Sequence, residues 1–149
     1  MEVRMLKHPL ANVVVKGNPK NRRMLIEVLG SLGKAGINVY GVGVEEDELK
    51  FYVKESECDR AVGILDRVVR GNIQFYIMKG IGMITVSGGG RGRFSDIDTL
   101  IAPVKREVRV VDIIRSDNSA QLFVELRDRG RAFQKLVKRV TNGFRVTKA

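Results

Sequence analysis

The chain has 149 residues, of which 44% are hydrophobic and 30% charged, a balance typical of a soluble globular protein. No apolar run approaches the roughly 20 residues of a membrane-spanning helix, and the first residues lack the apolar core of a secretory signal, so we expect a cytoplasmic protein without membrane contact. One cysteine and one histidine cannot supply a structural zinc site, and we expect neither a metal nor a cofactor.

The formal net charge is +10, which raises the question of nucleic acid binding. Residues 1–80 hold 13 Lys and Arg against 10 Asp and Glu, whereas residues 81–149 hold 14 against 7. The basic residues are spread over predicted turns and helix surfaces, and tryptophan is absent. A dedicated RNA binder interleaves cations with stacking aromatic side chains, so we interpret most of this charge as a solvated surface.

Residues 12–53 contain a strand, a helix and two further strands. Three β-branched valines at 13–15 favour a strand, and Gly17-Asn18-Pro19 ends it. From Asn21 onward, apolar residues recur at the three- and four-residue spacings of one helix face: Met24, Leu25, Val28, Leu29 and Leu32. Residues 39–44 and 49–53 then alternate as two strands around a polar turn at 45–47.

Residues 56–78 complete this pattern with a second helix and a fourth strand. Ser56 and Asp59 have the spacing of a capping box at the start of the helix. The alternation of Ile73, Phe75 and Ile77 with polar and larger residues predicts the last strand. Residues 12–78 therefore read βαββαβ, a ferredoxin-like arrangement of four antiparallel strands with both helices on one face, which makes the fold class α+β.

The second half repeats this pattern at an offset of about 71 residues. Matched pairs come from strands, helices and turns in one register: Val13 with Ile84, Val15 with Val86, Leu29 with Leu100, Phe51 with Leu122, Leu65 with Leu136, and residues 45–47 with 116–118. We predict two tandem modules joined near Lys79-Gly80, with domains at 1–80, including an N-terminal arm at 1–11, and at 81–149.

The first helix of the second module carries a local conflict. Ser95 and Asp98 make a capping box, but Pro103 falls where the first module has Leu32, inside the helix, at a cost of about 3 kcal/mol. We therefore expect this helix to be shorter or kinked. The loop before it, SGGGRGR at 87–93, is the most unusual segment of the chain.

These paired modules resemble the two ACT domains of the aspartokinase regulatory region. The likeness is carried by the element order, by AGINV at 35–39 entering the second strand, by GMITVSGGG at 82–90, and by Arg60-Ala61-Val62 with Leu65 in the second helix. The resemblance implies a non-catalytic protein that binds an amino acid or a similar small anion at a loop or domain interface and transmits the binding allosterically. It also implies a homodimer and a partner that is a separate kinase or biosynthetic enzyme subunit, since the sequence holds no kinase domain.

We predict a ligand site in the first module, where the loop before the first helix meets the start of the second strand. The unpaired N–H groups of that helix start and its dipole favour a carboxylate, and the Asn38 amide offers both a donor and an acceptor to a zwitterion. The predicted residues are Asn18, Pro19, Lys20, Asn21, Ile37, Asn38 and Val39. Lys20 and Arg22 favour a ligand with a second carboxylate or a phosphate; the alternative is that Gly17-Asn18-Pro19 is only a turn.

The glycine loop supports a second hypothesis, because successive backbone N–H groups beside a helix start can bind an anion. The residues of this possible anion site are Gly89, Gly90, Arg91, Gly92 and Arg93. The loop lacks the Lys-Ser or Lys-Thr of a P-loop, and a flexible turn is the alternative.

Enzymatic and nucleic-acid functions are less favoured. His8 precedes a proline in the N-terminal arm, and Cys58, in the first turn of the second helix, has no histidine near it in sequence, so we expect no catalysis. The alternative function is a basic RNA-binding module, because RRM domains share the βαββαβ order. In the third strand, however, Phe51 and Tyr52 point to opposite faces, and the first strand offers only valines, so the stacking platform is missing.

Overall fold

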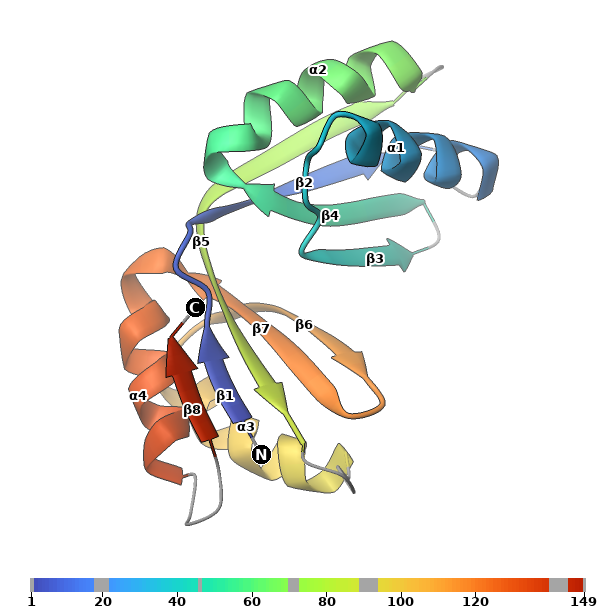
Figure 1. Cartoon of the computed structure of the whole chain (residues 1–149). Helices are drawn as coiled ribbons and strands as arrows, with labels where there is room; N and C mark the ends of the chain where they lie inside the picture. Colours follow the sequence, from blue (N-terminus) through green and yellow to red (C-terminus); the bar gives the residue numbers. More distant parts are fainter. Residues whose placement is uncertain are drawn as a thin grey trace. The chain divides into compact units, whose positions relative to one another are not determined.

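The computed structural model describes residues 2–17, 22–45, 47–69, 73–88, 94–139 and 145–148 (Figure 1). They form two compact units. The continuous unit is Leu10–Lys79, and the split unit joins Met1–Pro9 to Gly80–Ala149. The division falls inside strand β5 (Gln74–Ser87), at Gly80, whose φ of 72° is readily adopted by glycine. We expected residues 1–11 to be an arm of the first module, but residues 1–9 belong with the second half of the chain.

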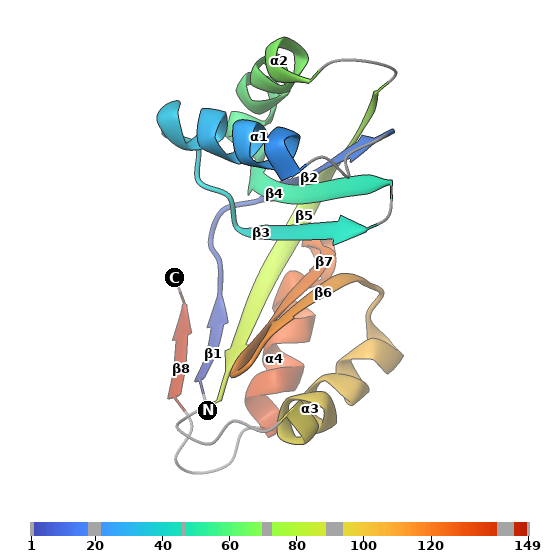
Figure 2. The ribbon, with the colours of Figure 1, turned by 90° about the vertical axis from the view of Figure 1, so that its right-hand side faces the viewer.

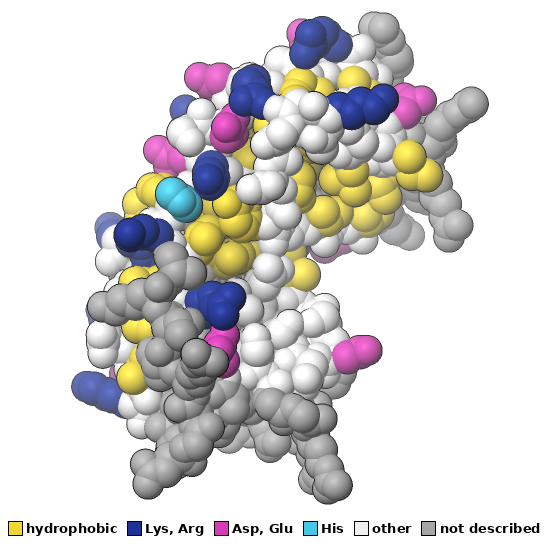
Figure 3. All heavy atoms as spheres, in the orientation of Figure 1, with side chains coloured by type: hydrophobic (Ala, Val, Ile, Leu, Met, Phe, Trp, Pro, Cys, Tyr) yellow, Lys and Arg dark blue, Asp and Glu magenta, His cyan; other side chains and the backbone are white. Residues whose placement is uncertain are grey.

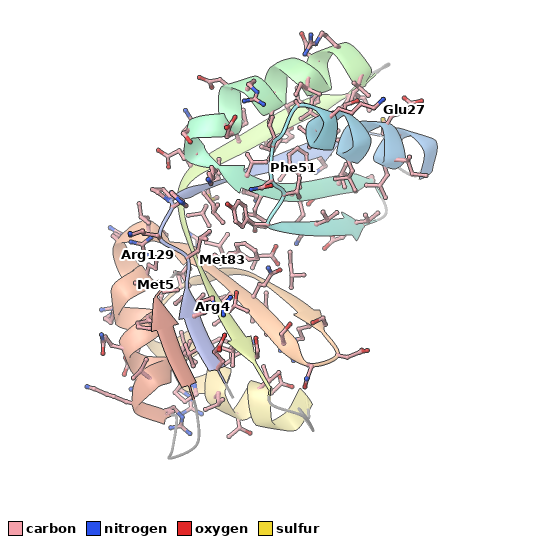
Figure 4. The ribbon with its side chains drawn as sticks, in the orientation of Figure 1. Arg4, Met5, Glu27, Phe51, Met83 and Arg129 are labelled. Atoms are coloured by element: carbon pink, nitrogen blue, oxygen red, sulfur yellow. The ribbon has the colours of Figure 1, made fainter. Side chains whose placement is uncertain are left out.

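The continuous unit has strands in the order β3-β4-β2-β5. Its elements are β2 (Leu10–Lys16), helix α1 (Arg22–Lys34), β3 (Gly41–Glu45), β4 (Glu48–Lys54), a short 3-10 turn at Glu55–Glu57, helix α2 (Cys58–Val68) and the first part of β5. Side chains that alternate along β2 and β4 are buried with those of α1 and α2, so both helices cover one face of the sheet (Figure 2). Phe51, fully buried on β4, lies in this core (Figure 4).

The split unit has strands in the order β6-β7-β5-β1-β8. Its elements are β1 (Glu2–Met5), the rest of β5, helix α3 (Phe94–Glu107), β6 (Val110–Ser116), β7 (Ser119–Glu125), a 3-10 turn at Leu126–Asp128, helix α4 (Arg129–Arg139) and β8 (Arg145–Lys148). Its core again joins sheet and helix residues, among them Ile84, Ile101, Leu122 and Phe133.

Elements of the two units recur at the predicted spacing. Strand β7 begins 71 residues after β4, α4 begins 71 residues after α2, and the two 3-10 turns keep the same interval. The burial patterns of β4 and β7 are identical along all seven residues. The prediction of an α+β protein is confirmed.

The sheet of the split unit differs from the predicted four antiparallel strands, because it has five and one pair is parallel. Val3 of β1 lies opposite Val86 of β5 in antiparallel register and beside Val146 of β8 in parallel register. The N-terminal strand thus occupies the position next to β5 that the fourth strand of a ferredoxin-like module takes, and β8 lies one strand further out with its direction unchanged (Figure 2).

The predicted helix starts and the effect of Pro103 were wrong. Ser56 lies in the 3-10 turn, and the N-cap of α2 is Glu57, without a side-chain capping bond. Helix α3 starts at Phe94 and runs through Pro103 to Glu107, so it is no shorter than α1. Val104 is fully buried beyond the proline. Because burying a valine contributes roughly 1.5–3 kcal/mol, packing of the last turn offsets much of the cost of proline.

Candidate functional site

The predicted first-module site lies partly outside the described residues, since Asn18, Pro19, Lys20 and Asn21 are not among them. Its other half follows the end of α1. The Gly36 N–H donates to the Gly33 carbonyl and the Ile37 N–H to the Leu32 carbonyl, both at 3.0 Å, and Gly36 has a φ of 75°. This is a Schellman ending, which buries Ile37 in the core and leaves the next residue, Asn38, exposed. Val39 packs against the core.

The corresponding residues of the split unit line an open pocket of about 470 Å³. Val108 and Arg109 stand 71 residues after Ile37 and Asn38, at the same place between helix and edge strand. The pocket lies where α3 ends and β6 begins. Its lining residues are Lys105, Val108, Arg109, Val110, Asp112 and Ile113. We call these six residues the β6 pocket.

Charges of both signs stand in the β6 pocket. The Arg109 guanidinium is 3.9 Å from a carboxylate oxygen of Glu125, and its side chain is 76% exposed, so this ion pair is long and solvated. Glu125 has a closer partner in Arg127, at 2.7 Å. Lys105 is exposed and forms no ion pair with the part of the chain that the structure describes. The site thus offers two cationic groups that are only weakly engaged.

An irregularity in β6 brings an acidic side chain to the same pocket. The pairing of β6 with β7 shifts by one residue between Val110 and Asp112, whereas β3 pairs with β4 without a shift. Such a bulge re-aims the neighbouring side chains. The Asp112 carboxylate accepts the Ile113 N–H at 2.9 Å through one oxygen, which fixes its orientation beside the apolar wall of the pocket. A carboxylate has about four acceptor positions, so this bond leaves capacity for a ligand.

These side chains match the chemistry of a zwitterion. Arg109 and Lys105 suit a carboxylate, Asp112 suits an ammonium group, and Val108, Val110 and Ile113 form an apolar surface for an aliphatic side chain. In the continuous unit the places of Arg109 and Asp112 are held by Asn38 and Gly41, which carry no charge.

Sequence reasoning identified Arg109 only as the counterpart of Asn38, and it did not single out Asp112. The 71-residue offset was the signal that could have found the β6 pocket, because it carries the predicted residues 37–39 onto 108–110. The bulge that orients Asp112 has no sequence pattern of its own, since β-branched residues continue through it.

The other candidates do not form a site in the described residues. Gly89, Gly90, Arg91, Gly92 and Arg93 lie outside them. His8 is exposed, and Cys58 is buried, which raises the pKa of its thiol instead of lowering it as a helix start would. No group of three potential metal ligands occurs in the described ranges, and no helix there is long and apolar enough to cross a membrane.

The aromatic residues of β4 argue against RNA binding by this sheet. Phe51 and Tyr52 are both fully buried, so neither can stack on a base. Figure 3 shows Lys and Arg side chains along the helices of the continuous unit and hydrophobic side chains on its β3–β4 side, which keeps the cations apart from the sheet.

Two paired α+β units with a charged pocket beside an edge strand define a class of small regulatory folds, and the comparison with solved structures is specific within it. The regulatory subunit of aspartate kinase from Thermus thermophilus, in its ligand-free form, superimposes with a TM-score of 0.80 at 15% identity, over 93% of this chain and 96% of that one. A putative C-terminal regulatory domain of aspartate kinase from Porphyromonas gingivalis gives 0.71 at 14% identity, over 94% and 95%.

The whole aspartate kinase from Synechocystis matches this chain with a TM-score of 0.78 at 15% identity, over 91% of this chain and 26% of that one. The sequence matches no protein-family model and no curated protein. The resemblance to the aspartokinase regulatory region is therefore confirmed at the level of the fold.

Proposed function

We propose that this protein is a non-catalytic regulatory subunit that binds an amino acid and passes the binding on to a partner enzyme. The observation that carries the proposal is the likeness to aspartate kinase regulatory subunits over nearly the full length of both chains. On this proposal the two units are copies of one ACT-type module, with the N-terminal strand added to the second.

We place the ligand of this subunit in the β6 pocket. A small amino acid with an aliphatic side chain fits its six residues, with the carboxylate on Arg109 and the ammonium group on Asp112. The site around Ile37, Asn38 and Val39 stays a prediction for a second ligand, because its loop half is not described.

The partner of this subunit is a separate enzyme chain, for which an aspartate kinase catalytic chain is the first candidate. One neighbour in the comparison is a structure of aspartokinase alpha and beta subunits, which matches with a TM-score of 0.72 at 17% identity. The proposed assembly also contains two copies of this chain, because a two-fold dimer lets ligand binding in each copy alter the packing of the other.

A thermal-shift screen against the proteinogenic amino acids, followed by calorimetric titration of any hit, tests the proposal. A ligand at 100 times its Kd stabilises the folded chain by about 2.7 kcal/mol, which is easily detected. Arg109→Ala should abolish the shift. Arg127→Ala, which removes the other cation on Glu125 but lies outside the pocket, is the matched control and should retain it.

Each outcome of the screen has a distinct meaning. If no amino acid shifts the melting temperature, ligand binding is wrong. If Arg109→Ala binds as tightly as the wild type, the site lies elsewhere, and Asn38→Ala then tests the first module. Kinase activity of a catalytic chain measured with and without this protein tests the partner separately.

A further inference from the structure

The first part of β5 presents an open strand edge in the continuous unit. Residues 74–79 follow β2 in the sheet order, and no described strand pairs with their other edge, since β1 pairs with β5 only at residues 84–87 and β7 only at 81–87. Backbone N–H and C=O groups along such an edge form a template for another strand.

Large apolar side chains project from both faces of this edge. Tyr76 is 51% exposed, and Ile77 and Met78 are each 44% exposed. The Tyr76 hydroxyl donates to the Gln74 side-chain oxygen at 2.6 Å, so the polar end of the ring is already satisfied and its apolar part is exposed to solvent. Three successive exposed apolar side chains beside unpaired backbone are unfavourable in a free monomer.

The other free edges of the described residues carry features that discourage pairing. Edge strand β3 contains Gly41 and Gly43 and ends at Glu45, β6 is bulged between Val110 and Asp112, and β8 is only four residues long. Residues 74–79 contain no proline, bulge or acidic residue, and their one charge, Lys79, lies close enough to the start of α2 to act on the pKa of Cys58.

We propose that the edge at residues 74–79 pairs with the same edge of a second copy of this chain, antiparallel and centred on Ile77. A two-fold axis normal to the sheet requires directly opposed residues to share a face, so the register must be centred on a residue. Centring on Ile77 sets Ile77 against its equivalent on the helix face. It sets Tyr76 against Met78 of the other copy, twice, on the opposite face, where thioether and ring make a favourable contact.

Charge also favours this occupant. In this register Lys79 lies opposite Phe75 of the other copy, so the two lysines are separated by about four residues of strand, roughly 13 Å. No like charges oppose each other within residues 74–79. The result is an antiparallel sheet that joins two continuous units and keeps both pairs of helices on one face.

This inference names the interface of the dimer in the proposed function and rests on it. The test is light scattering after size exclusion on the full chain. Ile77→Asp should convert the dimer to a monomer. Ile26→Asp, at the most exposed large apolar side chain, which lies at 69% on α1, is the matched control and should remain dimeric. Circular dichroism checks that both variants are folded.

A crosslink gives a second measurement that does not depend on dissociation. Cys58 is buried, so an engineered thiol is the reactive one. Opposed side chains of an antiparallel pair have Cβ atoms about 4.5–5.5 Å apart, within reach of oxidation with small backbone adjustment. Ile77→Cys should form a covalent dimer, whereas Val44→Cys, 54% exposed on the β3 edge, should not.

A monomeric wild type, a dimer that survives Ile77→Asp, dissociation by Ile26→Asp, or crosslinking through Val44→Cys would each overturn the assignment of this edge. The amino-acid screen separates this result from the proposed function. Ligand binding by a chain whose Ile77→Asp variant stays dimeric leaves the function standing without this interface. Monomeric Ile77→Asp with no ligand binding by the wild type leaves the interface standing without the function.

Discussion

Replacing Gly82 with alanine should destabilise the split unit through a single side chain, Arg129. A Cβ atom built on Gly82 would lie 2.8 Å from Cβ and 2.9 Å from Cγ and Cδ of Arg129, closer than real Cβ atoms approach. The Arg129 guanidinium donates to the carbonyl oxygens of Leu6 at 3.0 Å and Lys7 at 2.9 Å (Figure 4). The alanine methyl must therefore displace the arginine that fixes the end of the N-terminal segment.

The magnitude follows from the bonds that are lost. Hydrogen bonds to a charged group contribute roughly 1.5–3 kcal/mol each, and two partly exposed bonds at the low end give about 3 kcal/mol. Alanine in place of glycine returns roughly 0.5–1 kcal/mol by restricting the unfolded chain. The net loss should be about 2 kcal/mol, which lowers the melting temperature of a unit of this size by about 10 °C.

A double-mutant cycle read by urea unfolding provides the assay, with hydrogen exchange of the Leu6 amide, bonded to the Met83 carbonyl at 3.0 Å, as a local probe. Gly82→Ala should be costly in the wild type and neutral or stabilising in the Arg129→Ala background. Equal costs in both backgrounds, or unchanged exchange at Leu6, would refute the reasoning.

Three further predictions concern other parts of the chain. Gly63→Ala should raise stability by about 1 kcal/mol in thermal unfolding, because glycine is costly inside α2 and the new methyl meets no atom within 4 Å; Ala61→Gly is the converse control. The hydrogen bond from Lys135 at 2.6 Å lowers the pKa of Glu107. Lys135→Met should raise that pKa in an NMR titration. The stability that the pair contributes should be complete at neutral pH and fall away only as the pH drops through the lowered pKa. Burial raises the pKa of the Cys58 thiol, so a thiol reagent should react with it only on unfolding; prompt reaction in native buffer contradicts this.

Periodicity was sufficient to predict most elements of this fold. Leu49, Phe51 and Val53 alternate on β4 and are buried at 1% exposure or less, because a strand with one face on helices must alternate. The start of α2 was less predictable. Ser56 has a good capping side chain, but the chain enters α2 through a 3-10 turn, and cap chemistry alone cannot distinguish a first helical turn from a tighter one.

The candidate site was predictable only through the internal comparison of the two halves. Asn38 attracts notice by its amide, yet it stands exposed after a helix end, while its counterpart Arg109 lies in a pocket with an acidic partner. That difference depends on the bulge before Asp112, which is a tertiary feature of the β6–β7 pairing. Local sequence does not encode such a shift in register.

The position of β1 was beyond sequence reasoning for a different reason, which lies in two residues that differ between the units. Arg129 and Gly82 stand 71 residues after Cys58 and Ala11. In the continuous unit, the thiol and the alanine are both fully buried in the core. In the split unit, the larger guanidinium needs the bare backbone of Gly82, and it uses its two hydrogen bonds to hold the segment that carries β1. Neither change is informative alone, because an arginine at a helix start reads as a solvated cation and a glycine in a strand as a weak point. Together they mark where a length of chain distant in sequence is bound, so a paired change between repeats is the pattern that predicts the added strand.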